Sequence, residues 1–217
     1  MGAATQKRTS PPARLPGSRE AIVDAAERLF LAHGFGMVSM DELAKAAGVA
    51  RRTLYNQFDS KEAIFQEMLL RLSSQLNDAL PPGIETQGGV EDVLPLIARA
   101  ILELHKRPRY LGFFRIAVAE SRQFPWIPEA FAAVMEPAMD RLARYLSYLN
   151  ALGILDCRDS VLAAHQFTGM LNEFVLWPWL MGRKRLPVAA EEVITEATRM
   201  FLRRYRVQPG DKATKDF

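Results

Sequence analysis

The chain has 217 residues, 49% of them hydrophobic and 24% charged, which is typical of a globular protein of one or two domains. A single cysteine, Cys157, excludes an internal disulfide and a thiolate-based metal centre. The longest apolar run, residues 174–182, is about half as long as a membrane-spanning helix, and the N-terminus lacks a secretory signal, so we expect a cytoplasmic protein with no membrane anchor.

The charge is unevenly distributed along the chain. Residues 1–61 hold nine Lys and Arg against six Asp and Glu, whereas residues 62–217 hold nineteen of each. The whole net charge of +3 therefore lies in the first 61 residues. A basic N-terminal segment on a neutral remainder favours an anionic partner such as nucleic acid.

The first expected elements are an arm and four helices. Residues 1–17 are rich in Pro and basic residues with almost nothing apolar to bury, which predicts a flexible basic arm. Apolar residues at helical spacing follow it, and the sequence from Ser39 to Glu42 is typical of a capping box that opens a short helix ending at Gly48. The four helices are expected over residues 18–34, 40–48, 51–57 and 60–80, the last one ended by Pro81 and Pro82.

Breaks rich in Gly and Pro divide the rest of the chain into further helical segments, and no alternating strand pattern competes with this interpretation. Pro178 lacks the N–H that would bond to the Phe174 carbonyl, so a helix should kink or end there. These helices are expected near residues 90–106, 109–122, 128–151, 159–181 and 189–206. The sequence thus predicts an all-α protein of about nine helices, with a flexible polar tail over residues 208–217.

The second and third expected helices are typical of a helix-turn-helix. Ala44 and Ala47 are small enough for the two helices to approach closely, and Gly48 permits the sharp turn between them. The outer face of the third helix is then exposed and fits the major groove of DNA. Its exposed side chains should be Arg51, Arg52, Tyr55 and Asn56. The alternative, from the residues alone, is an ordinary helical corner with two solvated arginines.

Residues 19–68 contain a series of short motifs at characteristic spacing. They are Ala25-Ala26, Leu29-Phe30, Gly34-Phe35, Ser39, Asp41-Glu42-Leu43-Ala44, Ala47-Gly48-Val49, Thr53-Leu54-Tyr55-Asn56-Gln57-Phe58 and Ser60-Lys61-Glu62-Ala63-Ile64-Phe65. With them the segment resembles the tetracycline-repressor (TetR) family of transcriptional regulators. The resemblance implies an all-α homodimer, with a three-helix DNA-binding domain over residues 18–65. A long helix would join it to a ligand-binding and dimerisation domain over residues 66–207.

The resemblance also implies roles for single residues. Side chains expected on DNA phosphates are Ser39, Thr53, Tyr55 and Lys61. Arg51 and Arg52 fall where the family reads base edges, and each guanidinium suits the O6 and N7 atoms of guanine. Asn56 is expected on an adenine or a phosphate. The sequence departs from the family pattern at Ala50, where a hydroxyl residue is usual, and at Arg52, where a small residue is frequent.

The second half of the chain is rich in large, adaptable apolar side chains that could line an effector cavity or simply form core. They are Phe113, Phe114, Met135, Met139, Phe167, Met170, Phe174 and Trp177. Such a lining predicts a small, largely apolar or aromatic effector, oriented by a polar group such as His165 or Asn172. The stretch from Phe113 to Ile127, with Trp177-Pro178-Trp179, resembles the AefR-like subgroup of the family.

The last two helices are expected to pair with a second copy of the chain as a four-helix bundle. The apolar residues expected on their exposed surface are Leu162, Phe167, Leu171, Val193, Ile194 and Phe201. No metal site, cofactor or catalysis is expected. His33, His105 and His165 have no second ligand at metal spacing, and Glu191-Glu192 suits a helix N-terminus.

These observations predict a ligand-responsive transcriptional repressor that binds a palindromic DNA operator as a homodimer and is released by a small apolar effector. Two alternatives stay open: a DNA-binding regulator controlled by a protein partner, and a helical small-molecule-binding protein with a vestigial DNA-binding domain. The helix over residues 60–80 is expected to be the only part of the second domain that abuts the first, and hence to transmit the effector signal.

Overall fold

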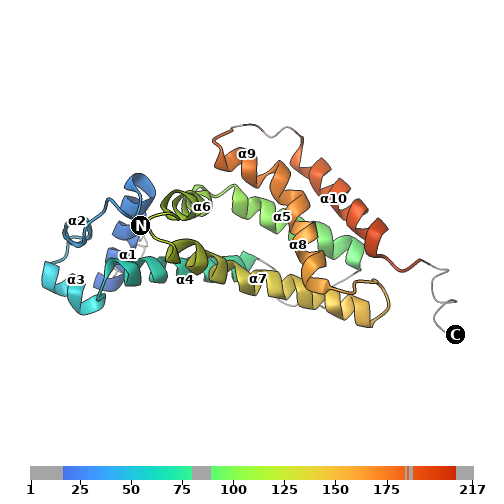
Figure 1. Cartoon of the computed structure of the whole chain (residues 1–217), viewed down its shortest axis with the longest axis horizontal. Helices are drawn as coiled ribbons and strands as arrows, with labels where there is room; N and C mark the ends of the chain where they lie inside the picture. The colour runs from blue at the N-terminus through green and yellow to red at the C-terminus, as the bar shows by residue number, and fades with distance from the viewer. Residues whose placement is uncertain (1–16, 80–88, 184, 186–187, 209–217) are drawn as a thin grey trace, which may run out of the picture.

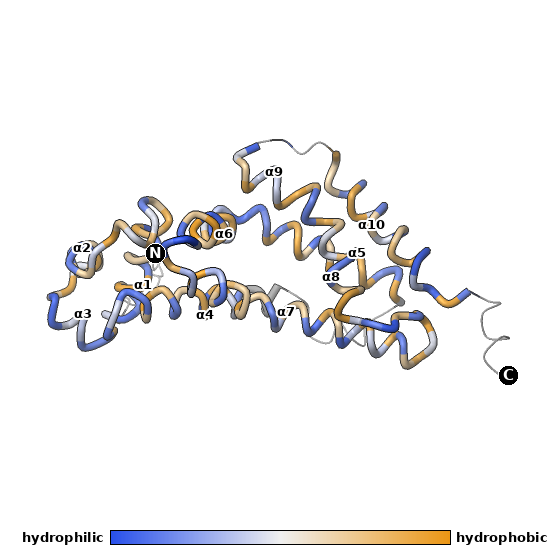
Figure 2. The backbone as a smooth tube through the Cα atoms, viewed as in Figure 1, coloured by the Kyte–Doolittle hydropathy of each residue, from blue (hydrophilic) through white to orange (hydrophobic). Residues whose placement is uncertain are grey.

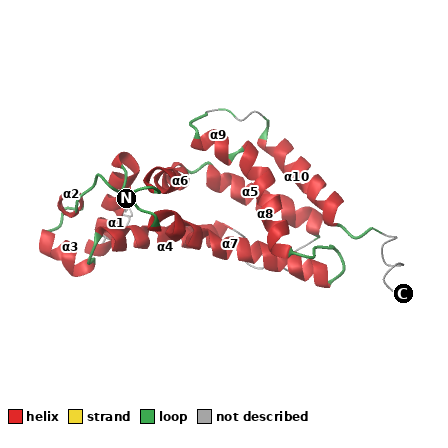
Figure 3. Cartoon of the chain, in the orientation of Figure 1, coloured by secondary structure: helices red, strands yellow, loops and turns green. Residues whose placement is uncertain are grey.

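The computed structural model describes residues 17–79, 89–183, 185 and 188–208, and this part of the chain contains ten helices and no strand (Figure 3). The predicted all-α class is confirmed. The helices are α1 (Ser18–His33), α2 (Met40–Ala46), α3 (Arg51–Gln57), α4 (Lys61–Ala79), α5 (Val90–His105), α6 (Pro108–Glu120), α7 (Trp126–Ala151), α8 (Ser160–Phe174), α9 (Leu176–Leu180) and α10 (Ala190–Tyr205). The predicted arm up to residue 16 and the predicted tail from residue 209 lie outside the described residues.

The molecule is elongated, with α1–α3 gathered at one end (Figure 1). We call these three helices the head and α4–α10 the body. Helices α4 and α7 run along the length of the molecule and pack against each other, while α5, α8 and α10 pack together at the other end (Figure 1). Hydrophobic and hydrophilic residues are interspersed along the longer helices (Figure 2), as expected of helices that bury one side and expose the other.

The helices of the head begin and end where local chemistry requires. The capping box of α2 is present, because Ser39 Oγ accepts from the Glu42 N–H at 3.2 Å and the Glu42 carboxylate accepts from the Ser39 N–H at 2.8 Å. These hydrogen bonds lower the pKa of Glu42. Helix α3 begins after Ala50, whose side chain cannot cap it, whereas the hydroxyl residue usual in the family at this position could.

Two apolar cores hold the chain together. One joins the head to α4, α6 and the start of α7, and the other lies among α5, α7, α8 and α10. The first contains a cluster of rings in which Phe65 of α4 lies 5.9 Å from Phe30 of the head, 6.2 Å from Phe113 of α6 and 5.6 Å from Trp126 of α7, between centroids. The head and the body therefore share one core.

The segment expected to be one helix over residues 159–181 is two helices, α8 and α9. The break lies at Val175, with φ of −120°. A continuous helix would have placed the Pro178 ring against the Phe174 carbonyl, whereas in the new helix Pro178 falls in the first turn, where no N–H is needed. Arg115 of α6 donates to the carbonyls of Trp179 and Leu180 at 3.0 and 3.2 Å, which fastens the end of α9 to α6.

The expected exposure of the last helices is wrong for five of six residues. Leu162 is exposed, but five others are buried in the body core: Phe167, Leu171, Val193, Ile194 and Phe201. They are buried because α10 packs on both α5 and α8, so that the rings of Phe167 and Phe201 meet at 5.3 Å within one chain. The large apolar residues exposed on α8, α9 and α10 and just after α9 are Val161, Leu162, Phe174, Trp177, Met181 and Met200, which we call the α8–α10 apolar surface.

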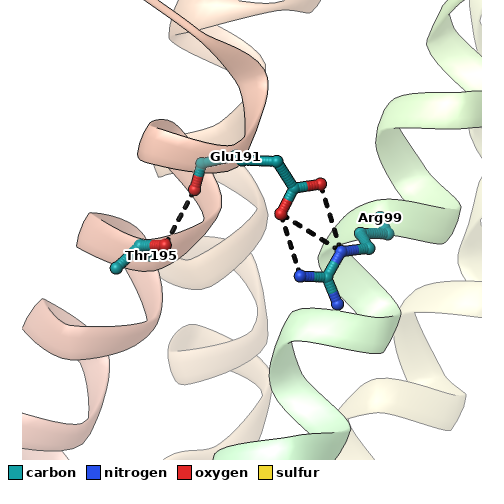
Figure 4. Close-up of polar contacts among 3 residues, drawn as sticks. All are labelled: Arg99, Glu191 and Thr195. Atoms are coloured by element: carbon teal, nitrogen blue, oxygen red, sulfur yellow. Dashed lines mark hydrogen bonds and ion pairs between the residues drawn. The ribbon is translucent and has the colours of Figure 1, made fainter.

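Ion pairs fix α10 antiparallel to α5. Arg99 of α5 donates from two nitrogens to Glu191 in the first turn of α10, with the shortest contact 2.8 Å (Figure 4). Glu91 and Arg206 form a second pair at the opposite ends of the same two helices. The hydrogen bonds from Arg99 lower the pKa of Glu191. Glu191 therefore has a structural partner.

Candidate DNA-binding surface and effector cavity

The helix-turn-helix lies at one tip of the molecule, with α3 outermost (Figure 1). The turn is closed by a hydrogen bond from the Val49 N–H to the Ala44 carbonyl at 3.0 Å, and Gly48 has a φ of 66°, which a side chain would disfavour. Leu54 is fully buried against the rest of the head. The opposite side of α3 is solvent-exposed and carries Arg51, Arg52, Tyr55 and Asn56, while Thr53 is half-buried.

The two arginines of this surface differ in their surroundings. Arg51 Nε lies 3.0 Å from Asp41 Oδ1, and its guanidinium lies 5.7 Å from the centroid of the Tyr55 ring. Arg52 is exposed and forms no hydrogen bond or ion pair with any described residue. Because the Arg51 pair is well exposed, it is worth little and can be exchanged for another anion. Arg52 can bind an anion without first giving up a partner.

The side chains of Lys61, at the start of α4, and Ser39, just before α2, both form hydrogen bonds inside the protein. Lys61 Nζ donates to the carbonyls of Phe35 and Val38 at 2.8 and 2.9 Å and lies 4.4 Å from the centroid of the Phe35 ring. Burial lowers the pKa of Lys61. The single Ser39 hydroxyl proton is donated to Glu42 at 2.8 Å. In this conformation both residues serve the fold, and the sequence motif did not reveal the Lys61 contacts.

The loop between α1 and α2 packs against the body. The Gly36 N–H donates to Glu120 Oε1 of α6 at 3.1 Å. The same oxygen lies 2.7 Å from where a Cβ on Gly34 would stand, and Gly34 has a φ of 84°, a left-handed conformation that favours glycine. Between the two glycines, the Phe35 ring packs edge-on against Phe124 and Trp126 at 5.0 and 5.4 Å.

Helix α6 also contacts the head at its other end, since Arg109 pairs with Glu27 of α1 at 2.5 Å. Burial raises the pKa of Glu27, and the Arg109 charge opposes that shift. Helix α4 contributes as expected, through the ion pair of Arg71 with Asp24 of α1 at 2.9 Å. The expectation that the helix over residues 60–80 alone abuts the head is therefore wrong, because α6 and the start of α7 do so as well.

A cavity of about 230 Å³ lies in the body among α5, α6, α7 and α8. Phe114, Met135 and Met139 line it, together with His165 and Asn172. The structure places the other sequence-predicted lining residues elsewhere. Phe113 and Phe167 are core, Met170 is half-buried, and Phe174 and Trp177 are exposed on the surface. Neighbours such as Phe113 and Phe114 point about 100° apart on a helix, so only one of them reaches the cavity.

Two family models match the chain. Residues 22–68 match the model described as bacterial regulatory proteins of the tetR family. Residues 92–207, more than half of the chain, match the model described as the C-terminal domain of AefR-like transcriptional repressors. The chain belongs to the TetR family.

Relatives of this TetR-family chain support the assignment. An HTH-type transcriptional regulator of Mycobacterium tuberculosis is 53% identical over 187 residues, which cover 82% of this chain and 85% of the relative. The regulator AlkX of the same organism is 31% identical over 124 residues, and this match covers 57% of this chain but only 52% of AlkX. These relatives are named as transcriptional regulators, so the chain is a DNA-binding regulator and not an enzyme.

Solved structures show the same fold. The flavonoid-responsive regulator FrrA superimposes with a TM-score of 0.78 at 31% identity, covering 88% of this chain and 98% of FrrA. A TetR-family regulator from Mesorhizobium loti superimposes with a TM-score of 0.76 at 24% identity, covering 88% and 97% of the two chains.

The resemblance of the head to the TetR family gave no information on which polar residues line the cavity. His105, Tyr110 and Thr168 contribute to it and were missed. His105 follows Ile97 and Ile101 at intervals of four residues on the apolar side of α5. A polar residue in such an apolar row was the one sign in the sequence that His105 could line a cavity. Among the described residues there is no cluster of three metal ligands and no helix long and apolar enough to cross a membrane.

The Lys61 contacts generate a prediction about stability. Lys61→Met should lower the free energy of unfolding by about 1–3 kcal/mol, because two carbonyls lose a charged donor while the aliphatic stem is kept. Urea denaturation of the full-length chain measures this. The control is Arg52→Ala, which removes a cation from the exposed side of α3 and should change stability by less than about 0.5 kcal/mol. If the two variants are equally stable, Lys61 has no structural role in the head.

Proposed function

We propose that this chain is a ligand-responsive repressor that binds a palindromic operator as a homodimer in the cytoplasm and needs no cofactor. A small, largely apolar effector bound in the body cavity would release it from DNA. The observation that carries this proposal is the dual attachment of α6. Its residues Tyr110 and Phe114 line the cavity, and its residues Arg109 and Glu120 bond to the head.

DNA binding is assigned to the exposed side of α3. The helix is two turns long and stands clear of the body, as entry into a major groove requires (Figure 1). Arg52 presents an unpaired guanidinium fork, which suits a guanine edge, and Arg51 can exchange Asp41 for a base or a phosphate. Tyr55, Asn56 and Thr53 lie on the same helix for contacts to the backbone or an adjacent base.

Dimerisation is assigned to the α8–α10 apolar surface. One chain has a single recognition helix, so two copies related by a two-fold axis are needed to read a palindrome. Leu162 and Trp177 are each about half exposed, although they are large apolar residues that gain free energy when buried. A second copy of the same surface would bury them without changing the core of either chain.

The effector is assigned to the cavity by its size and lining. About 230 Å³ is slightly below the usual range of about 300–1,000 Å³ for ligand sites, which favours a small molecule. Phe114, Met135 and Met139 provide aromatic and polarisable walls. That FrrA is named as flavonoid-responsive supports an aromatic effector for this chain too.

Operator recognition is tested with a binding site selected from random duplexes by the full-length protein. Arg52→Ala should weaken binding to that site by about 1–3 kcal/mol and relax one base position in each half-site, because one bidentate base contact is lost. Electrophoretic mobility shifts on single-base variants measure both effects. The control, Lys45→Ala on α2, removes the same charge and should leave the base preference intact. Unchanged base preference in Arg52→Ala would refute the assigned contact.

Assembly is tested by placing a charge in the α8–α10 apolar surface. Leu162→Glu should convert the dimer to a monomer at micromolar concentration and abolish tight operator binding, because the carboxylate would be buried without a partner. Sedimentation velocity measures the state of assembly. Leu70→Glu makes the same change at an exposed position on α4 and should stay dimeric. A wild-type protein that sediments as a monomer would overturn the proposed dimer.

The proposed coupling between effector binding and operator affinity is tested at the contact between α6 and the head. Glu120→Leu removes the acceptor of the Gly36 N–H, so an effector in the cavity should no longer change operator affinity by the roughly 5 to 150-fold that a typical coupling supplies. Operator affinity with and without 2-naphthol, a small aromatic probe, gives this ratio. Glu129→Leu, on the exposed side of α7, should keep the wild-type ratio. Equal ratios in both variants would exclude Glu120 from the coupling.

A further inference from the structure

Two polar atoms of residues that line the cavity lack hydrogen-bond partners. His105 Nδ1 and Asn172 Oδ1 are buried, and neither has a partner in the described protein. The whole His105 residue is only 2% exposed. Buried polar atoms in folded proteins almost always have a partner, so these two atoms indicate where a ligand is expected to bind.

The cavity offers nothing to balance a charged ligand. Its lining contains no Asp, Glu, Lys or Arg. Burial lowers the pKa of His105 to about 4, so its imidazole is neutral at physiological pH. His165 is the other imidazole of the lining, and it belongs to an exposed residue of α8. A carboxylate or ammonium bound deep in the cavity would lose its hydration without gaining a counter-charge.

The two hydroxyl protons of the cavity lining already have acceptors. Thr168 Oγ1 donates to the Ala164 carbonyl at 3.0 Å, and the Tyr110 hydroxyl donates to Met135 Sδ at 3.3 Å. Asn172 Oδ1 can only accept a hydrogen bond. The ligand must therefore supply an O–H or N–H donor at that point, with an apolar body against the Phe114 and Met139 side chains.

We propose that the cavity selects electrically neutral aromatic molecules with a hydrogen-bond donor, such as phenols, whose O–H donates to Asn172 Oδ1 and whose second polar atom, where present, meets His105 Nδ1. This inference rests on the proposed effector function of the same cavity and specifies its ligand class. The two unpartnered atoms are then a cost to the ligand-free protein that binding removes.

The test uses three probes with the same ring system on the full-length chain at pH 7.5. 2-Naphthol carries a donor, 2-methoxynaphthalene lacks it, and 2-naphthoate carries a negative charge. Isothermal titration calorimetry should show 2-naphthol binding about ten-fold more tightly than the methyl ether, because one buried acceptor stays unpaired with the ether. The naphthoate should bind about a hundred-fold more weakly than 2-naphthol.

Variants then identify the acceptor. Asn172→Leu keeps the size of the side chain and should abolish the preference for 2-naphthol over the ether while raising the Tm of the ligand-free protein, because an unpartnered oxygen is removed. His105→Phe keeps a ring beside Tyr110, which lies 5.3 Å away between centroids, and should also raise the Tm. The control is Thr195→Val, whose hydroxyl donates to the Glu191 carbonyl inside α10, away from the cavity, and it should keep the ligand preference.

Equal affinities for 2-naphthol and its ether, tighter binding of the naphthoate, or no binding of any probe would each overturn the inference. Operator release separates this inference from the proposed function. If 2-naphthol binds with the expected preference but operator affinity is unchanged, the ligand class stands and the inducer function fails. If the naphthoate binds and releases the operator, the inducer function stands and the ligand class is wrong.

Discussion

The ring of Phe35 lies fully buried between head and body, where it meets Phe30, Phe65, Phe124 and Trp126 at centroid distances of 5.0 to 5.4 Å. Phe35 stands in a loop, and loops seldom bury a large side chain. It does so here because the flanking glycines leave room for the Glu120 carboxylate, and because Lys61 binds the loop carbonyls from the other side. The positions of α2 and α3 depend on this contact, since α2 begins five residues after Phe35 and α3 packs against α2.

The free energy that holds Phe35 in its site can be compared with the free energy that a bound effector supplies. Burial of one Phe side chain is worth about 1.5–3 kcal/mol, and each aromatic pair adds about 0.5–1.5 kcal/mol. A small effector supplies a coupling of about 1–3 kcal/mol, which is too little to pull Phe35 out of its site. In the proposed function, the head would therefore move together with the ends of α6 and α7 that hold it, as one packed unit.

The head could be predicted from sequence because its determinants are local. The capping box at Ser39, the turn at Gly48 and the exposed side of α3 follow from the order of residues over a few turns, and the structure has them. The contacts of Lys61 could not be predicted, because they depend on a loop 23 to 26 residues away in the chain.

The body could be predicted only as a set of helices. An apolar side chain is equally suited to a core, a cavity wall or a subunit contact, and which of these it becomes is decided by tertiary packing. Phe113 and Phe114 are neighbours in sequence, yet one joins the ring cluster and the other lines the cavity. Five residues expected on the surface of α8 and α10 are core for the same reason, because α5 packs against both helices.

The position of the cavity makes α6, in the proposed function, the helix that would respond to a ligand. Helix α8 lines the cavity through Thr168 and Asn172, but it also carries Leu162 and Phe174 of the α8–α10 apolar surface. In the proposed dimer a second copy holds that surface in place, so α8 is the fixed wall. Helix α6 packs against α5 and α7, and its Arg115 bonds to α9, but it contributes nothing to that surface. In the proposed function, a ligand that widens the cavity would therefore move α6 rather than α8, and the head with it.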